Sequence, residues 1–124
     1  MFTRQDYLNH KCTHEQYYSQ FVTPGMLKVL SDTVFKSYVS DTKGPKILAG
    51  DYTPAFAVEL MAKDLELTLD LAKDLKMPVP ITNVAKDIAY AAISHGKAKL
   101  DYCAIASVYE MLANLELSAS DQKG

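Results

Sequence analysis

The sequence contains no tryptophan, only two cysteines and only five glycines among its 124 residues. The cysteines, Cys12 and Cys103, lie far apart and form no CxxC pair, so we interpret them as reduced thiols of a cytoplasmic protein. The glycines form neither a GxGxxG pattern nor a P-loop, and no HExxH motif is present. These absences argue against a Rossmann fold, a P-loop nucleotide site and a zinc-protease site within the chain.

The composition also lacks strong charge of one sign and long apolar runs. The net charge is −2, with 48% hydrophobic and 23% charged residues, which is ordinary for a globular domain. No apolar run approaches the roughly 18 residues of a membrane span, and the start of the chain is too polar for a signal peptide. We therefore expect one domain that binds neither nucleic acid nor membranes.

No segment alternates apolar and polar residues as a half-buried strand does, whereas helical periodicity recurs along the chain. The expected fold is all-α, a single-domain bundle of four to five helices. The loop between the second and third of these helices is expected over residues 39–52. The expected helices cover residues 14–22, 26–38, 53–76, 82–95 and a last stretch from 101.

The longest expected helix, Thr53 to Lys76, organises the others. Thr53 can act as its N-cap and Pro54 as its first residue, and the prolines at 78 and 80 end it. Apolar residues recur along it at spacings of three and four, which predicts a core-facing stripe. The stripe consists of Ala57, Leu60, Met61, Leu65, Thr68, Leu71, Ala72 and Leu75.

Similar stripes mark the other expected helices. In the helix over 26–38 the stripe is Leu27, Leu30, Val34 and Tyr38. In the helix that Thr82 caps it is Ile81, Val84, Ala85, Ile88 and Ala92, and His95-Gly96 forms the C-terminus. The last helix has Asp101 as N-cap and carries Ala104, Ile105, Val108, Met111, Leu112 and Leu115.

Two charges, Lys63 and Asp64, interrupt the apolar pattern of the long helix. A charge flanked by apolar residues needs a partner, water or a ligand. One interpretation makes them surface charges that pair locally with Glu59 and Glu66. The alternative is that they face a ligand.

The first 24 residues differ from the rest of the chain. Thr13 to Gln16 fits a capping box, so a short helix is expected until Pro24 and Gly25 end it. Its aromatic side consists of Tyr17, Tyr18 and Phe21. The predicted organisation is an N-terminal extension over 1–24, a helical domain over 25–117 and a frayed tail over 118–124.

His10, Cys12 and His14 alternate in a way that could place three zinc ligands on one side of an extended strand. Structural zinc sites use four ligands, usually in two separated pairs, and the sequence offers no second pair. We therefore interpret the three as unrelated polar residues and expect no metal site.

Several motifs in order resemble the C-terminal domain of the β-hydroxyacid dehydrogenases, the family of 3-hydroxyisobutyrate dehydrogenase and tartronate semialdehyde reductase. The most specific is Lys63-Asp64-Leu65 in a long helix with a proline pair after it. The resemblance covers roughly Leu27 to Leu117. Its other parts are Gly44-Pro45-Lys46-Ile47-Leu48, Asp51-Tyr52-Thr53-Pro54-Ala55-Phe56, Leu69-Asp70-Leu71-Ala72, Pro78-Val79-Pro80, Gly96, Asp101-Tyr102-Cys103-Ala104 and Tyr109-Glu110-Met111-Leu112-Ala113.

The resemblance implies a fold like the C-terminal domain of 6-phosphogluconate dehydrogenase. It implies that Lys63 reaches the cofactor cleft, with Asp64 beside it and Phe56 lining the same wall. It implies NAD or NADP as cofactor when a Rossmann domain is paired with this one. It also implies a homodimer or a separate chain that carries the Rossmann domain. The family's catalytic lysine lies upstream of the matched region, so no catalytic residue is assigned and the domain alone is expected to be inactive.

The sequence departs from the family pattern at two places. Lys76-Met77 stands where a glycine commonly precedes the proline pair, and Cys103 replaces a serine. Cys103 is interpreted as a buried core thiol and His95 as a favourable charge at a helix end. Lys28 follows Gly25 but falls among the family's later helices, so it is not assigned as the catalytic lysine.

Two other functions fit the residues. One is a non-enzymatic helical interaction or structural protein, phage- or mobile-element-derived, that reuses this fold and binds through its aromatic N-terminal segment. The other is an independent enzyme, for which only Lys63, Asp64 and His95 are available.

Overall fold

The computed structural model describes residues 3–11, 13, 16 and 23–117, and most of these residues lie in helices. Their β structure is limited to one isolated antiparallel bridge between Ala57 and Asp101. The predicted all-α class is therefore confirmed. None of the helices in the described ranges is long and apolar enough to cross a bilayer.

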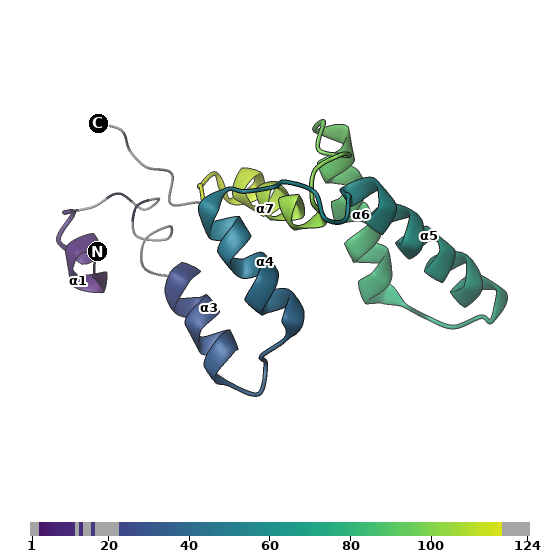
Figure 1. The fold of residues 1–124 in the computed structure, drawn as a ribbon, viewed down its shortest axis with the longest axis horizontal. Coiled ribbons are helices and arrows are strands. Elements are labelled where there is room, and N and C mark those ends of the chain that lie inside the picture. The colour runs from purple at the N-terminus through teal and green to yellow at the C-terminus, as the bar shows by residue number, and fades with distance from the viewer. Residues whose placement is uncertain (1–2, 12, 14–15, 17–22, 118–124) are drawn as a thin grey trace. The chain divides into compact units, whose positions relative to one another are not determined.

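The chain divides into two compact units, Met1–Asp51 with Glu110–Gly124, and Tyr52–Tyr109. Each unit is described by itself. Figure 1 labels the α-helices along the chain. The helices of the described residues, in chain order, are α1 (Arg4–Leu8), α3 (Thr23–Asp32), α4 (Tyr38–Ala49), α5 (Val58–Asp74), α6 (Pro80–Ser94), the 3₁₀ helix η2 (Tyr102–Ile105) and α7 (Ala106–Ala113).

The first unit begins with a helix that the sequence did not predict. In α1 the Thr3 hydroxyl accepts a hydrogen bond from the Asp6 backbone N–H, and the Asp6 carboxylate accepts one from the Thr3 N–H, which makes a capping box. The predicted capping box of Thr13 and Gln16 is confirmed by the same reciprocal bonds. Apart from Gln16, the helix expected over 14–22 lies outside the described residues, as do Cys12 and His14 of the set considered for zinc.

The expected break at Pro24 and Gly25 is wrong, because both residues lie in the first turn of α3. Proline is tolerated there since the first N–H groups of a helix have no intrahelical acceptor. The predicted stripe of this region is correct only in part. Leu27 and Leu30 are half-buried, whereas Val34 and Tyr38 are exposed because α3 ends at Asp32.

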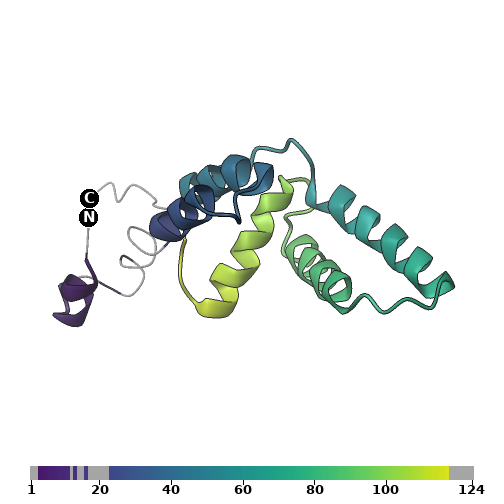
Figure 2. The ribbon, with the colours of Figure 1, turned by 90° about the horizontal axis from the view of Figure 1, so that it is seen from below.

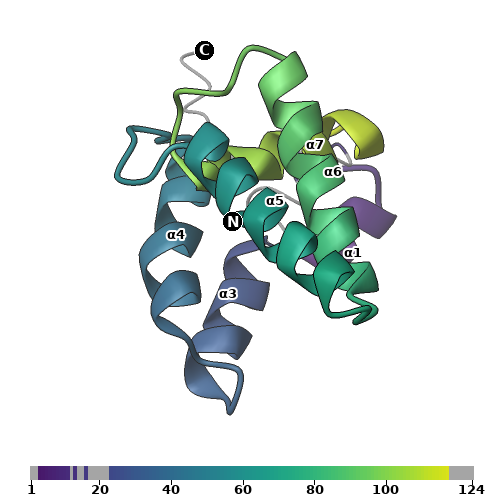
Figure 3. The ribbon, with the colours of Figure 1, turned by 90° about the vertical axis from the view of Figure 1, so that its right-hand side faces the viewer.

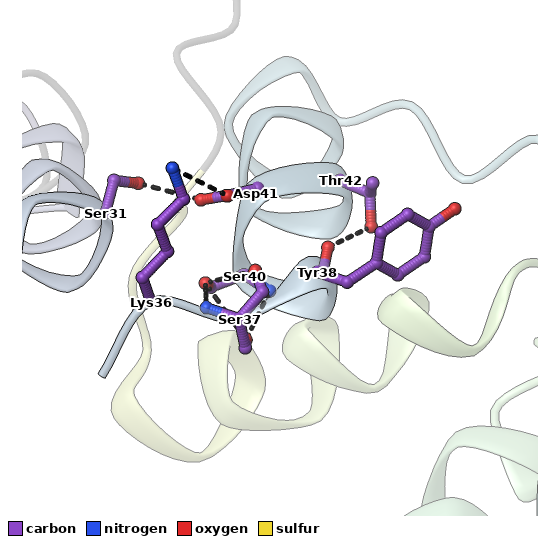
Figure 4. Close-up of polar contacts among 7 residues, drawn as sticks. All are labelled: Ser31, Lys36, Ser37, Tyr38, Ser40, Asp41 and Thr42. Carbon is purple, nitrogen blue, oxygen red and sulfur yellow. Dashed lines mark hydrogen bonds and ion pairs between the residues drawn. The ribbon is translucent and has the colours of Figure 1, made fainter. Parts of the chain in front are cut away.

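The loop expected over residues 39–52 is also wrong, because most of it forms α4. Ser37 caps this helix, and its hydroxyl and that of Ser40 form a third capping box (Figure 4). Gly50 ends the helix in the left-handed region, at φ 64°. The turn-forming residues of this stretch therefore mark the ends of a helix rather than a loop.

Gly44 and Pro45 lie inside α4, where the sequence suggested a break. Gly44 is buried against Leu27 of α3, and a β-carbon at this position would lie 2.8 Å from a Leu27 methyl group. The close approach of α3 and α4, which lie side by side in Figure 2, thus explains a glycine in mid-helix. Asp41 of α4 adds a hydrogen bond from Ser31 at 3.1 Å and an ion pair with Lys36 at 3.7 Å (Figure 4).

The second unit is built on α5 and α6, which run alongside each other as a hairpin (Figures 1 and 3). Its core consists mainly of small side chains, so the two helices can approach closely. Along each helix, the residues that face this core recur at spacings of three and four. The buried core cluster is Val58, Ala62, Ala89, Ala92, Ala104 and Val108.

The predicted stripes on α5 and α6 are only partly correct. In the stripe predicted for α5, Ala72 is buried and Leu65 half-buried, but Leu60, Leu71 and the C-cap residue Leu75 are 42–62% exposed. On α6, Ala92 is buried and Ile88 half-buried, but Ile81 and Val84 are 83% and 60% exposed. Because α5 has two apolar faces, periodicity alone could not tell which one packs on α6. The face with the small residues does.

The predicted start of the long helix is wrong. Thr53 and Pro54 precede it without regular secondary structure, and α5 begins at Val58 after Ala57, whose side chain provides no cap. The backbone N–H of Val58 instead donates to the Leu100 carbonyl at 2.9 Å, and that of Glu59 to the Ala98 carbonyl at 3.1 Å. Two groups that helices leave unsatisfied are thus capped from a distant segment.

The end of α5 agrees with the prediction. The helix stops at Asp74, and Lys76 has a positive φ of 53° before the proline pair. The next helix begins at Pro80 rather than after Thr82, because proline is favoured at the first helical position. It ends at His95-Gly96 as expected, with Gly96 at φ 78°.

Asp101 is an N-cap, as predicted, and its side chain accepts from the Cys103 N–H. The turn that it caps is the 3₁₀ helix η2, which leads into α7. Ala104 and Val108 of the predicted stripe are buried, whereas Met111 and Leu112 are 48% and 72% exposed.

We expect Ala92→Leu to lower the free energy of unfolding by about 1–3 kcal/mol, because Ala92 is fully buried in the core and larger side chains overpack such sites. The matched control is Ala113→Leu at an exposed helical position, which should change stability by less than about 0.5 kcal/mol. Urea denaturation followed by circular dichroism measures both. Equal effects of the two variants would contradict the close packing of α5 on α6.

We expect Ser37→Ala to lower the free energy of unfolding by about 1 kcal/mol, since it removes the side-chain cap of α4. In contrast, Ala57→Ser should add less than about 0.5 kcal/mol, although a serine N-cap usually stabilises a helix by more, because the first N–H groups of α5 already have acceptors. Chemical denaturation of the two variants tests this difference. A gain of a full kcal/mol from Ala57→Ser would show that the backbone caps are weak.

Candidate functional site

Phe56 lies in the segment that leads into α5, and its position is fixed from both the backbone and the ring. Its carbonyl accepts a hydrogen bond from the Tyr102 N–H at 2.7 Å. Its ring meets the Tyr102 ring edge-on, with centroids 6.3 Å apart and an interplanar angle of 74°. The side chain is half-buried. Phe56 therefore offers a partly exposed aromatic surface on a rigid support.

Asp101 holds the same segment through its side chain. The carboxylate is completely buried, and its Oδ2 accepts hydrogen bonds from the backbone N–H groups of Ala55 at 2.9 Å and Phe56 at 3.3 Å. Its Oδ1 accepts from the Cys103 N–H at 3.1 Å. A buried charge is tolerated here because hydrogen-bond donors surround both oxygens.

Lys63 and Asp64 lie in the second turn of α5 with exposed side chains. The predicted local ion pair between Lys63 and Glu59 is wrong, because Glu59 pairs with Lys99 at 2.6 Å. Neither the ammonium group of Lys63 nor the carboxylate of Asp64 forms an ion pair with any described residue. Both charges are therefore available to a ligand or to another domain.

The N-terminus of α5 is less available to an anion than a free helix end would be. The N–H groups of Val58 and Glu59 are bound to carbonyl oxygens, and those of Leu60 and Met61 donate to the Ala57 carbonyl. Phosphate groups usually bind helices through such N–H groups. An anionic ligand at this end of α5 would have to rely on the charge of Lys63.

The other candidate residues stand in different surroundings. Lys28 pairs with Asp32 one turn along α3, and this contact raises the pKa of the Lys28 ammonium group. His95 is the C-cap of α6, and its Nδ1 lies 2.8 Å from the Ala91 carbonyl oxygen. Cys103 is buried, as predicted. No cluster of three metal-ligating side chains occurs within the described part of the chain.

Sequence reasoning missed the second role of Asp101. It predicted a helix cap, whereas the carboxylate also binds the segment before α5, 45 residues earlier in the chain. It also missed Tyr102 as the support of Phe56. The available indication was the Asp-x-Cys-Ala motif, since an acidic residue just before an apolar helix start often binds backbone N–H groups, but the motif does not specify which ones.

Comparison with known proteins identifies the family. Residues 23–109 match the family model described as NAD-binding of NADP-dependent 3-hydroxyisobutyrate dehydrogenase. The chain is 34% identical to 3-sulfolactaldehyde reductase of Escherichia coli strain K12 over 80 residues. This aligned stretch makes up 64% of this chain and 27% of that protein. It is 32% identical to L-threonate dehydrogenase of Cupriavidus necator over 81 residues, a stretch that makes up 65% of this chain and 27% of that protein.

The fold comparison agrees. A crystal structure of 3-hydroxyisobutyrate dehydrogenase from Salmonella typhimurium superimposes with a TM-score of 0.68 at 28% identity, covering 75% of this chain and 33% of that one. The chain thus spans about a quarter of the sequence relatives that it matches and a third of the solved one. The matches favour the dehydrogenase resemblance over a reused fold of unrelated function. The chain belongs to the β-hydroxyacid dehydrogenase family, and the part it matches is the NAD-binding domain of the 3-hydroxyisobutyrate dehydrogenases.

Proposed function

We propose that this chain is the helical domain of an NAD(P)-dependent β-hydroxyacid dehydrogenase and that it forms one wall of the cofactor site. The observation that carries the proposal is the pair of exposed charges Lys63 and Asp64, which form no ion pair with any described residue and follow the firmly held Phe56 by seven and eight residues. Relatives that match this domain are named as reductases and dehydrogenases, and the matched family model is described as NAD-binding.

The chemistry of these side chains suits a dinucleotide. The Lys63 ammonium group is a point charge for a phosphate or for a polarised substrate oxygen. The Phe56 ring offers a face or edge for a nucleotide ring. Asp64 can accept hydrogen bonds from ribose hydroxyls or orient Lys63. Hydride transfer also requires a domain that holds the rest of the cofactor and a catalytic base, so the helical domain by itself is inactive in this proposal.

The cofactor proposal predicts that the purified chain binds NADH or NADPH weakly and that Lys63→Ala weakens this binding at least about tenfold, since a charge-assisted contact contributes about 1.5–3 kcal/mol. Isothermal titration calorimetry at low salt measures the affinity. Lys73→Ala, at the last turn of the same helix, is the matched control and should leave the affinity unchanged.

Two results would contradict this prediction. If neither dinucleotide produced binding heat at millimolar concentration, the domain would not hold the cofactor by itself. If Lys73→Ala weakened binding as much as Lys63→Ala, the effect would come from the overall charge of the helix rather than from a site at Lys63.

We also propose that the domain forms a homodimer. Leu67 and Leu71 of α5 and its C-cap residue Leu75 follow one another at a spacing of four residues, and each is about 60% exposed. Contiguous apolar surface of this kind usually marks an interface. A separate chain with a Rossmann domain is the other partner compatible with this surface.

The dimer proposal predicts a dimer at tens of micromolar by multi-angle light scattering, and a monomer for Leu71→Glu because it buries a charge in the interface. Val34→Glu introduces the same charge at a residue that is 94% exposed and should remain dimeric. A monomeric parent chain would contradict self-association.

We further propose that the protein works in the cytoplasm. Cys103 is a buried thiol outside any disulfide of the described residues, which is compatible with a reducing compartment.

A further inference from the structure

Two segments far apart in the chain, residues 52–57 and the residues around Asp101, are hydrogen-bonded to each other at the start of α5. The N–H of Asp101 donates to the Tyr52 carbonyl at 3.0 Å, and Ala57 and Asp101 form an antiparallel bridge. The backbone thereby brings the Asp101 side chain against the segment that contains Phe56. Only the carboxylate, however, accepts the N–H groups of Ala55 and Phe56.

A carboxylate is the side chain that this position requires. Its Oδ2 receives two N–H donors and its Oδ1 a third, so both oxygens act purely as acceptors. An asparagine of the same shape would place an NH₂ group, which is a donor, against at least one of these N–H groups. A buried donor without an acceptor is costly, so the substitution should disturb the backbone locally.

We propose that Asp101 is a positioning residue for the surface formed by Phe56 and Lys63. The inference rests on the function proposed above. The carboxylate fixes the amide of Phe56 while Tyr102 holds its carbonyl and ring. Because α5 begins two residues after Phe56, this also fixes the aromatic ring relative to the helix that carries Lys63.

The first test is amide hydrogen exchange of the full chain by NMR. Ala55 and Phe56 lie outside any helix, yet their amides should exchange slowly because they donate to Asp101. Asp101→Asn should accelerate exchange at these two amides at least about tenfold. The amides of Ala89 and Ala92 in α6 should change by less than about twofold.

The matched control is Asp87→Asn, which makes the same chemical change at a side chain that is 73% exposed. It should leave all four amides unchanged. Asp101→Asn without an effect at Ala55 and Phe56, or with equal acceleration throughout the domain, would overturn the proposal. If the variant does not fold, the parent chain decides: amides at Ala55 and Phe56 that exchange as fast as those of a free peptide would overturn it.

The second test separates this inference from the proposed function. NADPH added to the parent chain should shift the resonances of Phe56 and Lys63, and Asp101→Asn should weaken that binding about tenfold, whereas Asp87→Asn should not. No shifts in the parent chain would contradict the cofactor proposal, while the exchange data would still decide what Asp101 does. Equal affinity in Asp101→Asn and the parent would show that Asp101 does not position the cofactor surface.

Discussion

The start of α5 is completed by a segment some forty residues later in the chain, and the second unit depends on this arrangement. Leu100 and Ala98 supply carbonyl oxygens to the first N–H groups of the helix, while Asp101 supplies its carboxylate to the residues before it. A helix end normally uses a nearby side chain for this purpose. Here one set of contacts satisfies the helix end, orders the approach to it and closes the α5–α6 hairpin.

The second unit also contains a helix with two apolar faces, because α5 uses only its face of small residues to pack on α6. Alanines allow the two helices to meet through small side chains, so the larger leucines of α5 remain on the surface. Burial of these small side chains contributes correspondingly little hydrophobic free energy per residue. The backbone hydrogen bonds at the start of α5 therefore add to the packing that stabilises the unit.

The sequence predicted the fold class, the proline break after α5, the His95-Gly96 end of α6 and the burial of Cys103. These depend on local chemistry that short stretches of sequence contain. It failed where tertiary contacts decide. Thr53 looked like a cap because the acceptors at 98 and 100 could not be foreseen. Gly44 looked like a helix breaker because its packing on Leu27 is not visible in the sequence. The candidate residues Phe56, Lys63 and Asp64 came from the resemblance, and their role in binding stays a prediction.

The capping of α5 by residues 98–101 also has a consequence for synthesis on the ribosome. The helix is made well before the segment that completes its start, so its first N–H groups lack their native acceptors, the carbonyl oxygens of Ala98 and Leu100, until these residues have left the exit tunnel. Contacts of this sequence separation slow folding, because the loop between them must close first. The nascent hairpin should thus remain open and exposed to chaperones or to a partner until that moment, and α5 and α6 should fold together with η2 rather than one after the other.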